Sequence, residues 1–335
     1  MKAVVIETPH HVDVVSLEDP APGPHDAIVQ VEACGICGTD IHVLEGAFAP
    51  TRYPIVPGHE FCGEVVAVGA EVSDVRVGEF VAVDPSLPCG RCFFCRRGRG
   101  NLCENWNAIG VGAANGACAE LVRVPATSAF AVSDDMPRRF ATLVEPLACA
   151  VRGFDQVEVH LANAYLIYGA GTMGLLLAQL AAHAGAGQLD VVDVNPGRLD
   201  LARRLGADRV ATSADALEQP RGWDVVIDAT GAVPAIEDGL RRVRRGGSFL
   251  VFGVAKAEAS ARFSPFRVYN DEIRIIGSMA VLHSFERARD LLVKGVVDCP
   301  AMITHRYSLD AYGEAIQTFR SGQGLKVQVS PANSA

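Results

Sequence analysis

The chain has 335 residues, of which 49% are hydrophobic and 21% charged, a balance typical of a folded protein large enough for two domains. Its net charge of −9 argues against a nucleic-acid partner, since a phosphate backbone is bound by a basic face. Arginine clusters at 96–99 and 241–245 are expected to be solvated ends of helices or loops. No signal peptide or membrane-spanning apolar run is visible, so the ten cysteines predict reduced thiols in a cytoplasmic protein with no membrane partner.

Residues 1–140 alternate short β-like runs with turn signals and are rich in Val, Gly and Pro. This sequence pattern predicts an all-β, barrel-like domain whose loops carry the cysteines. After an initial strand at the N-terminus, the expected strands are AIVQVEA (27–33), FCGEVVAVGAEV (61–72), EFVAVDP (79–85) and CAELVRVP (118–125).

The residue pattern changes at 140–154, where the apolar residues have helical spacing. From 163 to 279, strands alternate with helices. This alternation predicts a parallel, doubly wound sheet. The strands expected in it are 164–171, 188–195, 209–213, 223–231, 248–254 and 273–279, with helices at 173–185, 197–207 and 235–247. Helices near 284–295 and 310–322 and a last strand at 325–331 are expected to return to the first domain.

The segment GAGTMG, from Gly169 to Gly174, fits G-x-G-x-x-G between a predicted strand and an apolar helix. Such glycines let a pyrophosphate approach the backbone at a helix N-terminus. Asp193 ends the next strand, where a carboxylate binds the adenosine ribose and repels a 2′-phosphate, so NAD is favoured over NADP. Arg198 keeps NADP open, or is simply a solvated residue of the next helix. The expected cofactor contacts are Gly169, Gly171, Thr172, Met173, Gly174, Asp193, Arg198, Thr230, Gly253 and Ser278.

The segment CGRCFFCRRGRGNLC carries Cys89, Cys92, Cys95 and Cys103. Four thiolates on one loop match the tetrahedral, all-sulfur ligand set of a structural zinc ion. An iron–sulfur cluster is the competing interpretation, but its usual spacing differs and no second cysteine array is present. With no open coordination position, the site is expected to stabilise a lobe at about 86–105 rather than perform chemistry.

A second set of candidate ligands is scattered. CGICGTDIH contains Cys37, PGHEFCG contains His59 and Glu60, and VEPLACA contains Glu145. The segment GHEFCGEVVAVGAEV matches the signature G-H-E-x2-G-x5-G-x2-V of the zinc-dependent alcohol dehydrogenases. With the four-cysteine segment and GAGTMG in the same order, the chain resembles the medium-chain dehydrogenase/reductase superfamily from end to end.

This resemblance implies an α/β protein with a GroES-like β-barrel catalytic domain at 1–145 and 281–335. A Rossmann NAD-binding domain would occupy 146–280. The resemblance also implies two zinc ions per chain, one catalytic and one structural, and NAD as the cofactor.

The third ligand of the catalytic zinc separates branches of the superfamily. Ordinary alcohol dehydrogenases carry cysteine there, whereas EPLACA places Glu145 at that position, as in the sorbitol, polyol and threonine dehydrogenases. Zinc would then be held by Cys37, His59 and Glu145, with Glu60 in reach as a transient ligand or through water. Cys62 and Cys149 are rivals for the third position, but they are expected to be packing thiols.

By resemblance, the chain oxidises a secondary hydroxyl of a polyol, sugar alcohol or cyclitol to a ketone with NAD⁺. Thr39 would accept the proton and pass it to His42, whose intrinsic pKa suits a shuttle near neutral pH. Cys34 would be a buried thiol rather than half of a dithiol. An L-threonine 3-dehydrogenase or general secondary alcohol dehydrogenase is the alternative enzyme, and a non-catalytic NAD- and zinc-binding protein the alternative class. Relatives of this kind are homodimers or homotetramers, often joined through the strand resembling IRIIGSM.

Overall fold

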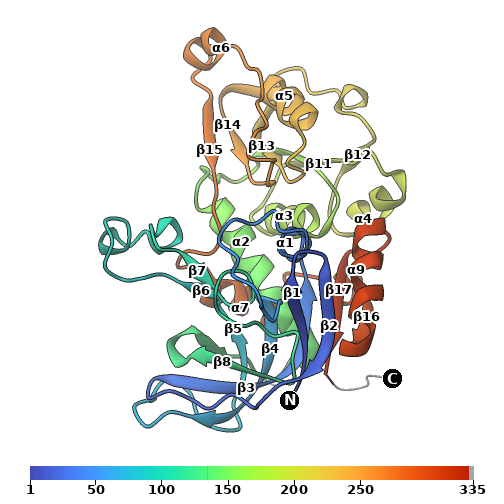
Figure 1. The fold of residues 1–335 in the computed structure, drawn as a ribbon. Helices are drawn as coiled ribbons and strands as arrows, with labels where there is room; N and C mark the ends of the chain where they lie inside the picture. The colour runs from blue at the N-terminus through green and yellow to red at the C-terminus, as the bar shows by residue number, and fades with distance from the viewer. Residues whose placement is uncertain (134, 332–335) are drawn as a thin grey trace. The chain divides into compact units, whose positions relative to one another are not determined.

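The computed structural model describes residues 1–133 and 135–331. The chain divides into two units, both drawn in Figure 1. The first consists of Met1–Ala148, Val281–Gly295 and Cys299–Ala335, and the second of Cys149–Ala280 and Val296–Asp298. Within the described ranges, no helix is both long and apolar enough to cross a membrane.

A seven-stranded sheet forms the centre of the first unit. Its strand order is β16 (Ile303–Ser308), β17 (Lys326–Ser330), β3 (Asp26–Ile36), β4 (Glu60–Val68), β5 (Phe80–Val83) and β9 (Ala129–Ala131), with β8 (Leu121–Pro125) also paired to β3. The pairing of β17 with β3 is antiparallel and places Val327 opposite Ile36 and Val329 opposite Cys34. The end of the chain therefore becomes an inner strand beside the segment that carries Cys37.

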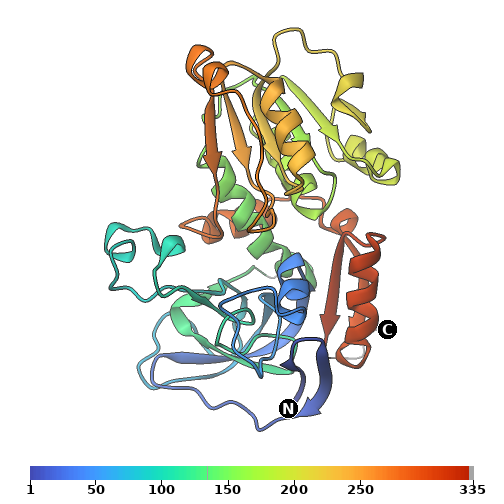
Figure 2. The same cartoon turned by 45° about the horizontal axis from the view of Figure 1, so that its top comes forward.

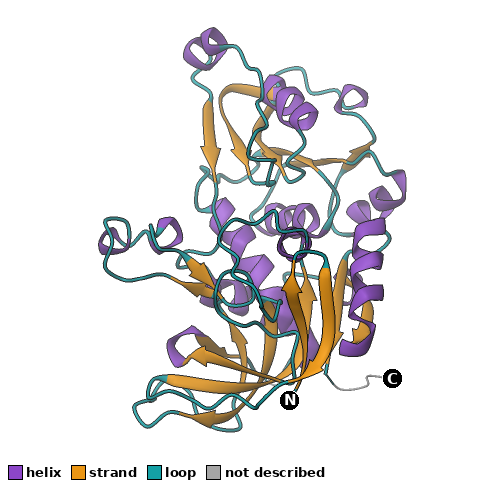
Figure 3. Cartoon of the chain, viewed as in Figure 1, coloured by secondary structure: helices purple, strands orange, loops and turns teal. Residues whose placement is uncertain are grey.

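Apolar, mostly β-branched side chains on these strands make the core of the first unit. Helix α9 (Tyr312–Ser321) packs along β16 and β17 (Figure 3). The other elements are β1 (Lys2–Thr8), β2 (His11–Ser16), β6 (Ser86–Leu87), β7 (Asn107–Ala108), α1 (Gly38–Leu44), α7 (Phe285–Val293) and α8 (Cys299–Met302). Helix α2 (Val144–Phe154) begins in the first unit and ends in the second. Single turns of 3₁₀ helix occur at Cys95–Arg97, Gly100–Leu102, Ala126–Ser128 and Leu309–Ala311, and a longer one at Arg138–Leu143 precedes α2.

Six parallel strands make the sheet of the second unit, seen in Figure 2 with helix α5 (Val233–Arg242) against it. Their order is β12 (Arg209–Ala211), β11 (Gln188–Val192), β10 (Ala164–Tyr168), β13 (Trp223–Asp228), β14 (Val243–Val251) and β15 (Arg274–Gly277). Numbered along the chain, this is the 3-2-1-4-5-6 arrangement of a doubly wound sheet, whose order reverses between β10 and β13. The helices of this unit are α3 (Thr172–His183), α4 (Leu199–Arg204), α5 (Val233–Arg242) and α6 (Pro265–Asn270), with 3₁₀ turns at Pro196–Arg198 and Ala214–Ala216.

The predicted alternation of strands and helices is confirmed, although several boundaries differ from those expected. The largest difference lies between the third helix and the strand after it. The helix expected at 235–247 ends at Arg242, and β14 begins at Val243. Val243 is 1% exposed and pairs with Trp223, so burial of a β-branched side chain outweighs continuation of the helix. The pairing of β13 with β14 is then interrupted by a bulge before Ser248 pairs with Val225. This bulge accommodates the two glycines that directly precede Ser248.

Candidate metal centres and dinucleotide site

Three predicted ligands come together in the first unit. One ligand atom from each of Cys37, His59 and Glu60 lies within 4.8 Å of the other two. The pairing of β3 with β4 explains this, because Glu60 begins β4 opposite Gly35, and Cys37 follows directly on β3 as the N-cap of α1. A thiolate, an imidazole and a carboxylate are a donor set that zinc accepts, so these residues fit the expected metal.

Asp40 connects two of these ligands and is not among the residues predicted for the site. Its Oδ2 accepts a hydrogen bond from the backbone N–H of Cys37 at 2.8 Å, and its Oδ1 lies 3.4 Å from Nδ1 of His59. A carboxylate at Nδ1 orients the ring and leaves Nε2 to bind a metal. The sequence does carry a signal for it, since Asp40 is three residues after the N-cap of α1, where a side chain can reach back to the N-cap N–H.

The electrostatics of His59 follow from this contact. Burial lowers the pKa of His59, but the charge and hydrogen bonding of Asp40, together with those of Cys37, raise it, so the net result is a pKa well above the usual value. Both side chains are buried, with Asp40 at 1% and His59 at 6% exposure. The pair therefore places a negative charge directly behind the imidazole.

Glu60 forms a buried ion pair with Lys326, the first residue of β17. The side chains are 1% and 3% exposed, and Nζ of Lys326 also donates to the carbonyl oxygen of Ile36 at 3.3 Å. A side chain at position 35 would overlap the carboxylate, so Gly35 makes room for it. Glu60 is thus no surface charge, and Lys326 is a second site residue that the sequence predictions omit.

Glu145 lies in the first turn of α2 and is partly buried. It is not one of the three residues whose ligand atoms meet within 4.8 Å. The pKa of Glu145 is raised to about 7, mainly by burial and also by the charge of Glu60, while the charge of His59 opposes the rise. These electrostatic effects show that Glu145 lies near the side chains of His59 and Glu60.

The two residues of the predicted proton relay are both on α1. Sγ of Cys37 lies 3.8 Å from Oγ1 of Thr39, so the hydroxyl is next to a predicted metal ligand. His42 is in the last turn of the helix and its side chain is exposed to solvent. Thr39 and His42 therefore have the inner and outer positions that a relay needs.

Of the thiols expected to be packing residues, Cys34 and Cys62 are buried in the first unit. Cys34 is completely buried, and a hydrogen bond with Cys118 together with burial raises the pKa of its thiol well above the usual value. Cys62 is also completely buried and donates to the carbonyl oxygen of Arg138 at 3.4 Å. Cys149 is partly buried in α2, and none of the three belongs to a group of converging metal ligands in the described chain.

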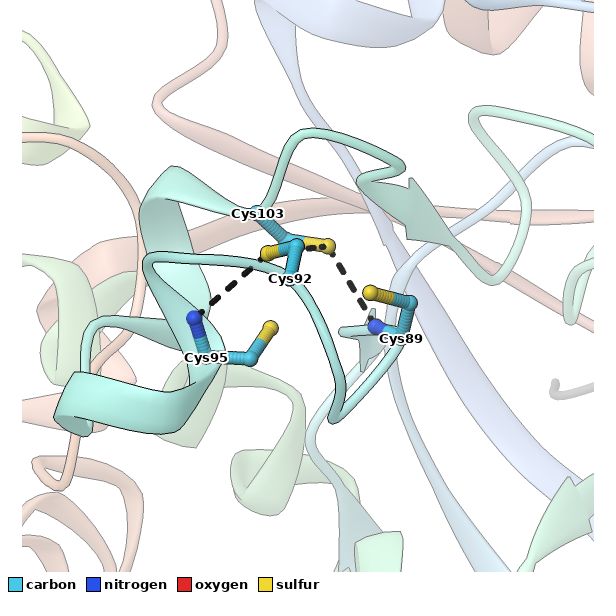
Figure 4. Close-up of side chains that lie close together, drawn as sticks. All are labelled: Cys89, Cys92, Cys95 and Cys103. Carbon is cyan, nitrogen blue, oxygen red and sulfur yellow. Dashed lines mark hydrogen bonds between the residues drawn. The ribbon is translucent and has the colours of Figure 1, made fainter.

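The four-cysteine segment forms the second candidate metal centre, shown in Figure 4. The sulfurs of Cys89, Cys92, Cys95 and Cys103 all lie within 4.8 Å of one another. Backbone N–H groups point at the sulfurs: the N–H of Cys89 lies 3.3 Å from Sγ of Cys103, and that of Cys95 lies 3.5 Å from Sγ of Cys92. The backbone N–H of Arg91 contributes most to lowering the pKa of Cys89 to about 6, which favours the thiolate that a metal requires.

The glycine segment has the geometry that a dinucleotide requires. Gly169 follows β10 with φ of +102°, a conformation that favours glycine, and a side chain at Gly174 would overlap the carbonyl oxygen of Gly169. Gly171 is the N-cap of α3, so Thr172 and Met173 open the helix with their N–H groups available to an anion. The loop fits the pyrophosphate of a dinucleotide.

The other predicted cofactor residues follow the neighbouring parallel strands. Asp193 follows β11, Thr230 lies just beyond β13, Gly253 beyond β14, and Ser278 follows β15. The carboxyl ends of parallel strands share one edge of the sheet, and ligands bind along that edge. Asp228 holds this edge in shape, since its carboxylate accepts hydrogen bonds from the N–H groups of Thr230 and Gly231, each at 3.0 Å.

Two family descriptions match the chain: "Alcohol dehydrogenase GroES-like domain" over residues 23–134 and "Zinc-binding dehydrogenase" over 172–294. The chain is 37% identical to D-arabinitol dehydrogenase 1 of Uromyces fabae, over 99% of this chain and 97% of that protein. It is 36% identical to D-altritol 5-dehydrogenase of Agrobacterium fabrum, over 85% and 86%, and 33% identical to L-threonine 3-dehydrogenase of Rhizobium rhizogenes, over 98% and 97%. A crystal structure of a putative zinc-binding dehydrogenase from Sinorhizobium meliloti 1021, bound to NADP, superposes with a TM-score of 0.95 at 35% identity, covering 98% of this chain and 99% of that one.

Proposed function

Because the chain belongs to the zinc-binding dehydrogenases of the medium-chain superfamily, with a GroES-like and a Rossmann domain, we propose that it is a polyol dehydrogenase. The reaction is the reversible oxidation of a secondary hydroxyl to a ketone with a nicotinamide dinucleotide. The observation that carries this proposal is the convergence of Cys37, His59 and Glu60, with Glu145 close by. A non-catalytic protein would have no need of this open, mixed-donor set.

Cys37, His59 and Glu145 would hold a catalytic zinc ion. Glu60, which is paired to Lys326, would be a further ligand, either transiently or through water. When bound there, zinc supplies Lewis acidity that lowers the pKa of a substrate hydroxyl. Asp40 orients the imidazole of His59 and the turn that carries Cys37, so the ligands are held before a metal arrives. The four cysteines of the second centre would hold a structural zinc ion, since they leave no open position.

The proton released from the hydroxyl needs a path to water. Thr39 is beside Cys37 and would receive the proton at Oγ1, and His42 would pass it to solvent from its exposed ring. Imidazole suits this step because its ordinary pKa is near neutrality. In the second unit, the glycine loop would bind the pyrophosphate and the carboxylate of Asp193 the adenosine ribose, which favours NAD⁺.

A sugar alcohol is the favoured substrate class, because two of the relatives described above are named for D-arabinitol and D-altritol. L-threonine is the second candidate, on the strength of a 33% identical threonine dehydrogenase. A panel of pentitols, hexitols, inositols and L-threonine, followed through NADH absorbance, separates the two. Turnover of threonine alone would replace the polyol assignment, and turnover of no alcohol would remove the enzyme proposal.

The metal assignment is tested with Cys37→Ala and Glu145→Ala, using Cys34→Ala as the matched control. We expect the first two variants to lose nearly all activity and about one zinc ion per chain, measured by inductively coupled plasma mass spectrometry, because each removes a proposed ligand. Cys34→Ala should keep both zinc ions and most of the activity. Full activity of Cys37→Ala would show that the metal centre is not catalytic.

We also propose a homodimer or homotetramer built through β15. This strand is at the edge of its sheet, pairs there only with β14 among the described residues, and leaves Ile275 40% exposed. An unpaired edge can pair with the same edge of a second chain. Ile275→Lys should lower the mass measured by size-exclusion chromatography with light scattering, and an unchanged mass would exclude this edge as the interface.

A further inference from the structure

One face of β17 is polar, although the whole strand is buried. Because side chains alternate along a strand, Lys326, Gln328 and Ser330 share this face, and the two valines between them belong to the apolar core. The three polar residues are between 1% and 3% exposed. Burial of a polar side chain is unfavourable unless it is hydrogen-bonded, so each of the three needs a partner, and Lys326 has Glu60.

Gln328 binds the segment that leads to Glu145. Its Nε2 donates hydrogen bonds to the carbonyl oxygen of Arg139 at 2.9 Å and to Oγ1 of Thr142 at 2.6 Å. Oγ1 of Thr142 in turn donates to the same carbonyl oxygen at 3.1 Å. Both hydrogens of the amide are used, while Oε1 has no hydrogen-bond partner among the residues that the structure describes. The amide of Gln328 therefore acts here as a donor to two acceptors of one segment.

The 3₁₀ turn Arg138–Leu143 connects this contact to the metal centre. It contains both partners of Gln328 and continues directly into α2, because Val144 has helical angles of φ −62° and ψ −45°. Thr142 is 0% exposed and lies three residues, close to one helical turn, before Glu145. Close packing around a buried segment leaves it little freedom to shift, so the position of Glu145 depends on where Gln328 holds the turn.

Resting on the proposed zinc-dependent function, we infer that Gln328 is a positioning residue for Glu145 and acts on it through the 3₁₀ turn. One face of β17 then fixes two of the carboxylates of the metal centre, since Lys326 holds Glu60 directly. Loss of the Gln328 amide should loosen the metal site without removing any ligand from it.

The test is a zinc titration of the full chain against a competing chelator, which does not depend on turnover. The affinity that Glu145→Ala lowers is assigned to the catalytic site. Gln328→Met keeps the approximate volume of the side chain but removes both donors, and we expect it to weaken zinc binding at that site by roughly 10-fold, as for other residues that orient a metal ligand. In the Glu145→Ala background, the same change should have less than about a twofold effect, because the ligand that Gln328 positions is already gone.

Ser330→Ala is the matched control. Ser330 is on the same face of β17 and is also buried, but it donates to the carbonyl oxygen of Glu32 at 2.7 Å, which is not part of the 3₁₀ turn. Both variants should lower the melting temperature, since each removes a buried hydrogen bond, but Ser330→Ala should leave the zinc affinity within about twofold.

Three results would overturn the inference: Gln328→Met binds zinc as tightly as the unaltered protein, Ser330→Ala weakens binding as much, or the loss persists undiminished in the Glu145→Ala background. Gln328 would then only stabilise the fold. If Glu145→Ala itself has no effect on zinc affinity, the proposed metal assignment fails, and the inference falls with it.

Discussion

Replacing Lys326 by Met should destabilise the first unit far more than an ordinary loss of surface charge. The change keeps the approximate volume of the side chain but leaves the carboxylate of Glu60, 1% exposed, without its cation. Removing one partner of a buried ion pair costs about 3–5 kcal/mol. For a unit of this size, each kcal/mol corresponds to about 2–4 °C in melting temperature, so we expect a fall of about 6–20 °C.

Scanning calorimetry on the zinc-loaded protein measures this fall, and two variants show whether charge is its cause. Lys2→Met removes one partner of an ion pair with Asp310 whose side chains are 44% and 60% exposed, so it should shift the melting temperature by no more than about 2 °C. The double variant Glu60→Gln/Lys326→Met removes both buried charges and should recover a large part of the loss. A fall below about 2 °C for Lys326→Met, or a double variant no more stable than the single one, would refute the idea that Lys326 neutralises Glu60.

Four further outcomes follow from the same site geometry. Cys95→Ser should lower the melting temperature and the zinc content by about one ion per chain while polyol turnover persists at low temperature, since we propose that the four-cysteine centre is structural; normal zinc content would contradict this. In side-by-side activity assays, Cys34→Ala should lower kcat by less than about threefold and Cys37→Ser by more than about 100-fold, because only the second thiol meets the other ligands. Zinc affinity measured with a competing chelator should rise as the pH increases through 7, because Glu145 has a pKa of about 7 and must lose its proton to bind metal; Glu145→Gln should flatten that part of the profile. His42→Ala should lower kcat by roughly 10- to 100-fold near pH 7, with recovery in added imidazole buffer, and an unchanged kcat would remove it from the proton path.

The second unit shows how much of a fold the local sequence pattern can predict. Its six strands alternate with helices, and a parallel sheet buries its inner strands on both faces, so an inner strand appears as a nearly continuous apolar run. Tyr165, Leu166 and Ile167 of β10 are all fully buried, as such a run predicts. The boundary at Val243 escaped prediction, because its position depends on pairing with Trp223, a residue twenty positions earlier in the chain, and not on local helix propensity.

The first unit shows the limit of that reasoning. Strand β16 was not predicted, although it pairs in parallel with β17, because its alternation of partly buried and exposed residues is weak. Lys326 is the clearer case, since nothing in LKVQVSP indicates a buried cation. It becomes a site residue only because β17 pairs with β3 and brings Nζ to Glu60, which lies 266 positions earlier in the chain.

The candidate ligands, the glycine loop and the alternation of strands with helices could be predicted from the amino-acid sequence, because each depends on residues that are close in the chain or on a recognisable signature. Which charges face one another could be found only from the folded chain. Glu60 meets Lys326, Asp40 meets His59, and Arg198 lies against Asp193, and these contacts set the charge at the metal centre and at the ribose end of the dinucleotide site. The physical reason is that electrostatic effects depend on distance and burial, which strand pairing establishes between segments whose order in the chain carries no record of it.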